Sequence, residues 1–418
     1  MTRHLDLRGG KPVWVTYKAP EVPVHELTRD AKCDVLIVGM GISGAMMAES
    51  LTDAGFSVIV IDRRDGAMLG STPATTALVQ FEIDQPLSTL SKKLGTAKAE
   101  QAWRRSRNAV ANLQARIEDL GIPCDHEPRN SLFIVGDVMD ADALKAEADM
   151  RRAAGIYSRF LNASELSHEF GLEREGAILS FDNLAINPRK LTAHLHLKAI
   201  ERGARYFAPV EAVEVKDSCD GVEVTTDSGH TISADHLVLA TGYELLDPAP
   251  QSGHKIISTW AIATEPQPEN LWPKETFIWE ASDPYLYLRT LPDGRVICGG
   301  EDEDFTDEDK RDAMLQEKTE RISAKMKALM PKLDTKPAFR WSGSFGVTET
   351  GLPWIGALPS HPRIFSMMGY GGNGITYSRI GVELVTGALT GNPDSDADLF
   401  AFTSGVSLIR RLIPTALA

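Results

Sequence analysis

Three glycines and one aspartate are spaced as in sites that bind a dinucleotide. Gly39, Gly41 and Gly44 form the pattern G-x-G-x-x-G, and Asp62 follows 21 residues after Gly41. In such a motif the first glycine permits a tight turn, the second lets the backbone approach a pyrophosphate, and the third lets a helix pack closely on a strand. A carboxylate at Asp62 would accept hydrogen bonds from ribose hydroxyls and repel a 2′-phosphate, which argues against NADP. These residues predict a site for NAD or FAD.

The glycine motif lies between two predicted strands joined by a helix, as a dinucleotide site requires. Cys33–Gly39 is a continuous apolar run, typical of a strand buried on both faces, and Phe56–Asp62 is a second such run. A helical stretch, Ile42–Ala54, joins them. Together they predict a βαβ unit with parallel strands, in which the helix N-terminus offers backbone amides and a partial positive charge to phosphates.

Further helices and strands follow along the chain. Apolar residues at helical spacing predict a long helix from Trp103 to Leu120, and the pair Asn187-Pro188 is typical of a helix start. The acidic run Glu301–Asp309 is interpreted as the solvated start of a helix rather than a metal site. Other predicted elements are a β-meander over Val210–Ala240, strands within 251–300, a strand pair around Arg340–Gly356, and a last helix from Ile375 to Leu389.

Composition limits the classes of protein to which the chain can belong. Its 418 residues are 43% hydrophobic and 24% charged, which is typical of a globular protein with two or three domains. The formal net charge of −14 predicts that nucleic acid is not a partner. The four cysteines are far apart and form no CxxC pair, so we expect neither disulfides nor a metal site. We expect no transmembrane segment and a cytoplasmic location, since no signal peptide or long apolar span is found.

Six motifs indicate a family. In chain order they are CDVLIVGMGISG, GSTPATTALVQ (Gly70–Gln80), INPRKL (Ile186–Leu191), VLATGYE (Val238–Glu244), RWSGSFGVTETGLPWIG (Arg340–Gly356) and MGYGGNGIT (Met368–Thr376). From about residue 33 to 390 the chain resembles the D-amino-acid-oxidase family of FAD-dependent oxidoreductases, which includes glycine, sarcosine and γ-glutamylputrescine oxidases. The resemblance implies an α/β fold in which a Rossmann-type FAD-binding domain carries an inserted α+β substrate domain on an antiparallel or mixed sheet.

The resemblance also implies a division of the chain. The N-terminal arm would be 1–30, the FAD-binding domain 31–90 plus 165–250 plus 340–418, and the substrate domain 91–164 plus 251–339. The residues expected to hold FAD are Gly39, Gly41, Ile42, Ser43, Gly44, Asp62, Arg63, Ser71, Thr72, Thr75, Thr76, Val210, Thr241, Gly242, Gly371, Gly372, Asn373, Gly374, Ile375 and Thr376. We expect the flavin to be non-covalent, because GSTPATTA contains no histidine and Arg340–Gly356 contains no cysteine.

Four cations that amino-acid-oxidising relatives use to bind a substrate carboxylate are missing. Phe345, Gly372, Gln80 and Thr376 stand where relatives have arginine or lysine. We therefore expect a substrate amine without a carboxylate on the reacting carbon. Hydride would pass from that carbon to flavin N5, the imine would hydrolyse, and oxygen or an electron carrier would take the electrons.

The candidate catalytic residues are Arg289, Tyr287, Gln80 and Tyr370. Arg289 either reaches the flavin pocket, to bind an acidic group or activate oxygen, or pairs at the surface with the acidic run. Tyr287 shares a strand face with Tyr285, so both line the pocket or both only pack the sheet; Tyr370 is open to the same two interpretations. Two other functions stay open, an NAD-dependent dehydrogenase and a non-catalytic FAD-binding subunit of a larger complex.

Overall fold

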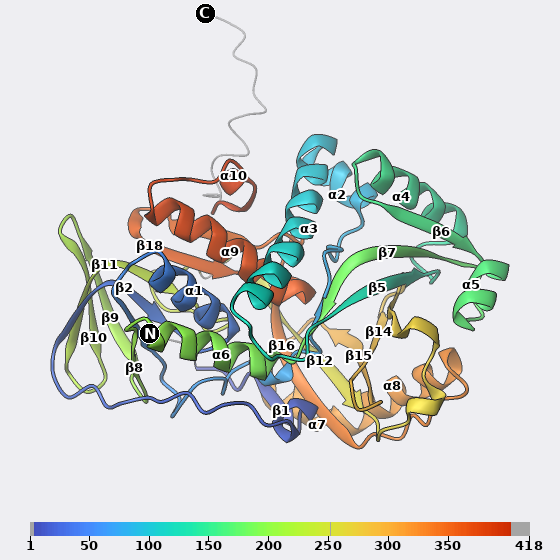
Figure 1. The fold of residues 1–418 in the computed structure, drawn as a ribbon, viewed down its shortest axis with the longest axis horizontal. Helices are drawn as coiled ribbons and strands as arrows, with labels where there is room; N and C mark the ends of the chain where they lie inside the picture. The colour runs from blue at the N-terminus through green and yellow to red at the C-terminus, as the bar shows by residue number, and fades with distance from the viewer. Residues whose placement is uncertain (1–3, 251, 403–418) are drawn as a thin grey trace, which may run out of the picture.

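Two β-sheets organise the residues that the computed structural model describes, 4–250 and 252–402 (Figure 1). The smaller sheet has the strand order β17 (Trp354–Leu358), β18 (His361–Met368), β11 (Thr231–Leu239), β2 (Ala31–Val38), β3 (Val58–Ile61) and β8 (Arg205–Phe207), with β10 (Gly221–Thr226) and β9 (Ala212–Ser218) extending from β11. From β18 to β8 the strands run parallel, whereas β17, β10 and β9 pair antiparallel.

The predicted βαβ unit forms the centre of the smaller sheet. Val35 lies opposite Val58 in the parallel pair β2–β3, and helix α1 (Ile42–Asp53) connects the two strands. Because β2 is covered on both faces, Val35, Leu36 and Ile37 are fully buried, as the apolar run predicts. Helices α6 (Pro188–Glu201) and α9 (Gly374–Leu389) pack against α1 on one face.

The larger sheet is mixed. Its order is β1 (Arg8–Gly10), β16 (Phe339–Thr348), β12 (His254–Ala263), β15 (Val296–Glu303), β14 (Leu286–Thr290), β13 (Phe277–Glu280), β5 (Glu127–Ile134), β7 (Gly176–Ala185) and β4 (Leu78–Val79), with β6 (Ser158–Asn162) beside β7. Among the described strands of this sheet, β13 and β5 pair in parallel and the other pairs are antiparallel. Its helices are α2 (Leu87–Leu94), α3 (Thr96–Asp119), α4 (Ala141–Ala153), α5 (Ala163–Phe170), α7 (Glu308–Ala313) and α8 (Leu315–Leu329); α10 (Ala397–Phe400) lies beside β17. The expected α/β fold with a Rossmann-type unit and a mixed second sheet is confirmed.

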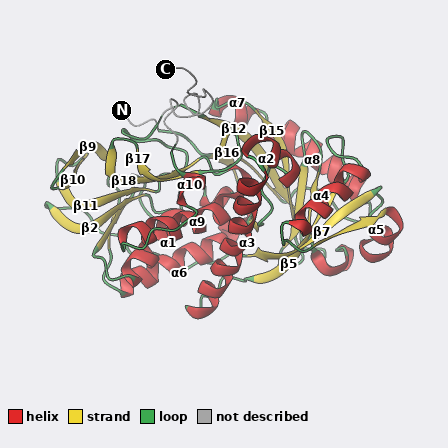
Figure 2. Cartoon of the chain, turned by 90° about the horizontal axis from the view of Figure 1, so that it is seen from above, coloured by secondary structure: helices red, strands yellow, loops and turns green. Residues whose placement is uncertain are grey.

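Several segments cross between the two sheets. The predicted strand pair around Arg340–Gly356 is wrong, because β16 pairs with β12 along its whole length and β17 belongs to the smaller sheet. Strands β7 and β16 lie in the larger sheet, although their ranges were expected in the FAD-binding domain. Helix α3 contacts both α9 and β7, and Figure 2 shows α1, α6, α9 and α3 side by side between the sheets. The helices therefore join the two halves of the molecule.

The N-terminal arm contacts both halves. β1 pairs antiparallel with β16, and His25 forms an isolated bridge with Phe207 in the smaller sheet. The buried Trp14 donates its indole N–H to the Thr75 carbonyl at 2.6 Å. The arm, which showed no periodicity in the sequence, is thus ordered by pairing with distant strands. Within the described residues, no helix is long and apolar enough to cross a membrane.

Candidate functional site

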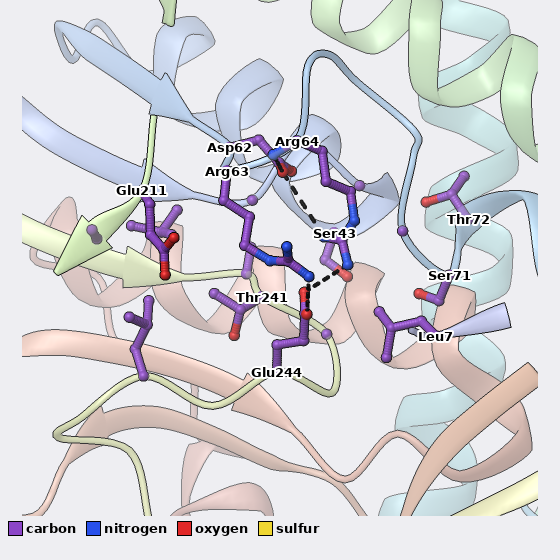
Figure 3. A pocket seen from close by; sticks show the side chains of 18 of the residues that line it. Leu7, Ser43, Asp62, Arg63, Arg64, Ser71, Thr72, Glu211, Thr241 and Glu244 are labelled. Atoms are coloured by element: carbon purple, nitrogen blue, oxygen red, sulfur yellow. Dashed lines mark hydrogen bonds and ion pairs between the residues drawn. The ribbon is translucent and has the colours of Figure 1, made fainter. Parts of the chain in front are cut away.

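Two adjoining cavities contain most of the residues that the motifs single out. The first, here called the strand-end cavity, lies where β2, β3 and β11 end and is lined by Gly39, Asp62, Thr241 and their neighbours (Figure 3). The second, here called the aromatic cavity, reaches from the start of α9 to β13 and β14. Both are lined by Ile42, Ser43, Ser71, Thr72 and Gly242. Together with the adjoining solvent, the two cavities enclose about 740 and 1190 Å³ of empty space.

The glycine motif adopts the expected turn. Gly39 has φ +117°, and a Cβ there would lie 2.4 Å from the Ala240 carbonyl oxygen. A Cβ on Gly44 would lie 2.0 Å from the Gly39 oxygen, so this glycine permits helix packing and does not line either cavity. Gly41, at the start of α1, lines the strand-end cavity.

Asp62 is held at the end of β3 by two backbone amides. Its Oδ2 accepts a hydrogen bond from the Met40 N–H at 2.8 Å, and its Oδ1 accepts one from the Arg64 N–H at 2.9 Å. Burial raises the pKa of this carboxyl, and the two amides oppose that shift. The carboxylate is therefore fixed against the glycine turn and faces the strand-end cavity, as a ribose-binding group requires.

A glutamate that the sequence analysis did not select organises the arginines of the same cavity. Glu244 accepts hydrogen bonds from Arg63 on one carboxylate oxygen and from Arg64 on the other (Figure 3). The Leu5 amide also donates to Glu244, at 2.9 Å. Arg63, Arg64, Val210 and Thr241 all line the cavity. Glu244 stands at the end of the VLATGYE motif, but its link to residue 5 depends on tertiary structure.

The glycine-rich turn before α9 forms one end of the aromatic cavity. Gly371, Gly372, Asn373, Gly374 and Ile375 line it, as do Thr75 and Thr76. A Cβ on Gly371, which has φ +54°, would lie 2.4 Å from Asp84 Oδ2. The turn thus presents backbone rather than side chains to the cavity, at the positive end of a 16-residue helix. Thr376 lies outside the lining and donates its hydroxyl to the Gln80 carbonyl at 2.7 Å.

Three of the four candidate catalytic side chains line the aromatic cavity: Tyr287, Gln80 and Tyr370. Tyr285 lines it too, and the two ring centroids of Tyr285 and Tyr287 are 5.6 Å apart. The intervening Leu286 is buried on the other face, as the predicted alternation requires.

Arg289 lies in neither of the two places expected for it, the flavin pocket and the surface beside the acidic run. It is 2% exposed, so it is not a surface residue pairing with the acidic run, and it lies outside the aromatic cavity's lining. Its guanidinium donates to the carbonyls of Ala77 and Ile186 and lies beneath the Trp14 ring. Burial lowers the pKa of Arg289 to about 9. The alternation assigned the strand face correctly, but Arg289 lies farther along the strand than the cavity reaches.

The described residues that line the aromatic cavity include acids and no basic side chains. Within the described chain, no lysine, arginine or histidine lines it, and Phe345, Gly372 and Gln80 occupy the lining where relatives were expected to carry cations. Two carboxylates that the sequence analysis did not select, Glu82 and Asp84, line it as well. The charge of the cavity is therefore the opposite of that needed to bind a carboxylate.

Comparison with known proteins agrees with this architecture. Gamma-glutamylputrescine oxidoreductase of Escherichia coli strain K12 is 23% identical over 382 residues, or 89% of this chain and 87% of that protein. Glycine oxidase from Geobacillus kaustophilus superposes with a TM-score of 0.73 at 20% identity, covering 90% of this chain and 100% of that one. L-proline dehydrogenase from P. horikoshii has the same score at 18% identity, covering 89% and 97%. The two solved structures establish the fold.

A family model named DAO, described as FAD dependent oxidoreductase, matches residues 34–387. The match includes the glycine turn, Asp62 and the turn before α9, which line the two cavities. Since this model spans most of the chain, the protein belongs to the DAO family of FAD-dependent oxidoreductases.

Proposed function

We propose that this oxidoreductase oxidises the C–N bond of an amine that has no carboxylate on its reacting carbon. The observation that carries the proposal is the charge of the aromatic cavity, which is lined by Glu82 and Asp84 and, among the described residues, by no cation. Transfer of a carboxylate into such a cavity would remove its water without compensation, at a cost of several kcal/mol. The NAD-dependent alternative is set aside because the family depends on FAD.

The cavities fit FAD by the chemistry of their linings. The glycine turn and the start of α1 present backbone amides to a pyrophosphate, and Asp62 presents a carboxylate to a ribose. The start of α9 has oriented N–H groups, which would stabilise the negative charge of a reduced flavin. No histidine or cysteine among the described residues lines either cavity, which supports non-covalent binding.

The protein's own residues bind and orient the amine. Bound FAD supplies the acceptor for two electrons and a hydrogen from the α-carbon, and water hydrolyses the resulting imine to a carbonyl compound and the remaining amine. Tyr287, Tyr285 and Phe345 form walls that hold the alkyl part of the amine and limit the water around it. Burial raises the pKa of both tyrosines, so their hydroxyls stay protonated and act as hydrogen-bond donors.

Anaerobic mixing of the purified holoenzyme with simple amines tests this function. We expect alkylamines to bleach the flavin absorbance, and glycine, sarcosine and D-alanine to bleach it at least about 10-fold more slowly at equal concentration. Equal or faster bleaching by the amino acids contradicts the substrate assignment. Absence of bleaching across the whole panel would instead favour a non-catalytic FAD-binding subunit.

Acid precipitation tests the mode of flavin attachment. We expect all the yellow colour to pass into the supernatant, because neither cavity offers a histidine or cysteine from the described chain. Colour that stays in the protein pellet would show a covalent link.

A further inference from the structure

One wall of the aromatic cavity carries carboxylates in a regular pattern. Within the segment 78–84, side chains alternate between the cavity and the core. The residues that line the cavity are Leu78, Gln80, Glu82 and Asp84, whereas Val79, Phe81 and Ile83 are at most 1% exposed in the hydrophobic core. The core residues fix the register, so the two acids are held on the same wall.

Glu82 is a buried carboxylate that lacks a full set of partners. Its side chain lines the cavity although the residue is only 3% exposed. Oε1 accepts a hydrogen bond from the Ser131 hydroxyl, while Oε2 has no hydrogen-bond partner among the described residues. No cation within the described chain forms an ion pair with it. A buried carboxylate oxygen without a hydrogen-bond donor lowers the stability of the folded protein, and a donor that reaches it restores that stability.

Asp84 extends the same wall toward α9. Its carboxylate is exposed to the cavity and accepts one hydrogen bond, from the Gly372 N–H at 2.8 Å. Removal of water by the surrounding protein raises the pKa of Asp84, and the Gly372 amide opposes the shift. Asp302, which lies outside the lining, is close enough for its charge and that of Asp84 to interact; burial raises the pKa of Asp302 to about 6, and the charge of Lys318 opposes that shift. The wall at Glu82 and Asp84 thus carries two carboxyl groups, and no lysine, arginine or histidine of the described chain lines the cavity beside them.

Aromatic rings complete the surroundings of the two acids. Trp279, Tyr285, Tyr287, Tyr243 and Phe345 line the same cavity. Trp279 is fixed by stacking on Phe133, with ring centroids 3.8 Å apart. Aromatic faces attract an alkylammonium group and also hold its methylene chain. Carboxylates with aromatic walls are therefore suited to an organic cation.

We infer that the preferred substrate carries a second positive charge, an ammonium group distant from the reacting amine, which binds at Glu82 and Asp84. An ammonium has three N–H donors, which suit two carboxylates on one wall, and Oε2 of Glu82 lacks a donor among the described residues. This inference rests on the proposed function and narrows its substrate class to diamines and longer polyamines.

Three amines with the same five-carbon chain separate this inference from the proposed function. Pentylamine, diaminopentane and aminopentanoate share the reacting CH₂–NH₂ group and differ at the far carbon, which is a methyl, a methylene that bears an ammonium, or a carboxylate. In anaerobic flavin reduction by the wild-type holoenzyme, we expect diaminopentane to half-saturate at a concentration at least roughly 10-fold below that for pentylamine, and aminopentanoate to bind most weakly. Equal half-saturation, or a preference for aminopentanoate, overturns the inference while the proposed function stands. If none of the three reduces the flavin, the proposed function itself fails.

Two variants test the assignment to Glu82 and Asp84. Asp84→Asn and Glu82→Gln keep the size of the side chain and remove its charge, so each should reduce the preference for diaminopentane over pentylamine by roughly 10- to 100-fold, chiefly in half-saturation rather than in the limiting rate. Asp220→Asn, an exposed turn residue outside both cavities, is the matched control and should keep the preference. An unchanged preference in both cavity variants would refute the assignment. The wild-type comparison decides the substrate class even where a variant does not fold.

Discussion

At the scale of single residues, carboxylates define what each cavity accepts. Asp62 is held by the amides of Met40 and Arg64, and Glu244 holds Arg63 and Arg64. Both acids are partnered from within the protein, which leaves the strand-end cavity preorganised for a polar ligand. Glu82 in the aromatic cavity has one oxygen without a hydrogen-bond partner among the described residues, and the proposed distal ammonium would supply that donor.

Asp62→Ala should weaken FAD binding by about 1–3 kcal/mol, the range for lost hydrogen bonds to a charged group. The change removes the acceptor for the ribose and also frees two backbone amides of the glycine turn. The dissociation constant of FAD for reconstituted apoprotein measures the effect by flavin fluorescence. Asp62→Asn, which keeps one acceptor oxygen, should lie between wild type and Asp62→Ala. Unchanged affinity in the alanine variant would remove Asp62 from the cofactor site.

Arg289→Ala should lower stability and leave substrate choice unchanged. The guanidinium donates to backbone carbonyls of Ala77, Ile186 and Thr290, and its loss leaves buried acceptors unpaired, at a cost of about 2–3 kcal/mol. Urea unfolding of the holoenzyme measures that cost. Since Arg289 lies outside the aromatic cavity's lining, the ratio of kcat/KM between pentylamine and aminopentanoate should match wild type. A change in this ratio of more than about 10-fold would return Arg289 to the substrate site.

The site residues that could be predicted from the sequence are those whose contacts lie close together along the chain. The glycine turn and Asp62 depend on spacing within one βαβ unit, so local pattern was sufficient to find them. Glu244 acts through the Leu5 amide, 239 residues away, and no local pattern marks such a contact. The alternation of side chains along β14 predicts the strand face on which Arg289 lies, but it does not predict how far along the strand the cavity extends. The alternation in 78–84 was readable too, and would have placed Glu82 and Asp84 on one face.

At the scale of elements, helix α6 contacts the glycine turn through one buried side chain. His196 is fully buried on this helix, its Nε2 lies 3.1 Å from the Met40 carbonyl oxygen, and its Nδ1 lies 2.9 Å from the Tyr206 hydroxyl. A neutral ring that donates to the carbonyl and accepts from the hydroxyl satisfies both contacts. Burial lowers the pKa of His196 to about 4. The helix thus holds the turn through a histidine that is neutral in the folded state.

Stability should therefore fall as the solution becomes acidic. His196 binds a proton near pH 6.5 in the unfolded chain and only near pH 4 in the folded one, so its contribution is complete above pH 6.5 and is lost as pH falls toward 4. Between pH 7.5 and pH 5 the loss amounts to about 2 kcal/mol. Urea unfolding at the two pH values should show a smaller decrease for His196→Gln than for wild type. His194→Gln, on the same helix, controls for the substitution itself, and parallel decreases in wild type and His196→Gln would contradict the assignment.

At the scale of the whole molecule, the N-terminal arm connects the halves and covers the strand-end cavity. Gly9 donates its amide to the Ser342 hydroxyl at 3.0 Å, and Leu7 lines the cavity itself. On the other side, the Leu5 amide reaches Glu244. This segment, expected from the sequence only as an arm, therefore forms part of the strand-end cavity, because its partners are supplied by strands far along the chain.

Removal of residues 1–10 should make the flavin dissociate faster. The deletion takes away β1, the amide that donates to Glu244 and the apolar contact of Leu7, so we expect an increase in the dissociation rate on the order of 10-fold. Release of flavin fluorescence after dilution measures this rate. Leu69→Ala alters an exposed leucine outside both cavities and should behave as wild type. An unchanged rate in the deletion variant would show that the arm does not retain the cofactor.

The position of β1 in the chain also determines when, during synthesis, the arm can pair with β16. Gly9 and Ser342 are separated by 333 residues, and translation at ~5–20 residues per second makes the second strand available roughly 15–70 s after the first. β1 therefore leaves the ribosome long before its partner β16 and pairs late, and until it does the arm does not cover the strand-end cavity at Leu7. FAD present in this interval would meet a strand-end cavity that the arm has not yet covered. A limiting supply of FAD during growth should thus leave more empty protein than the equilibrium affinity alone predicts.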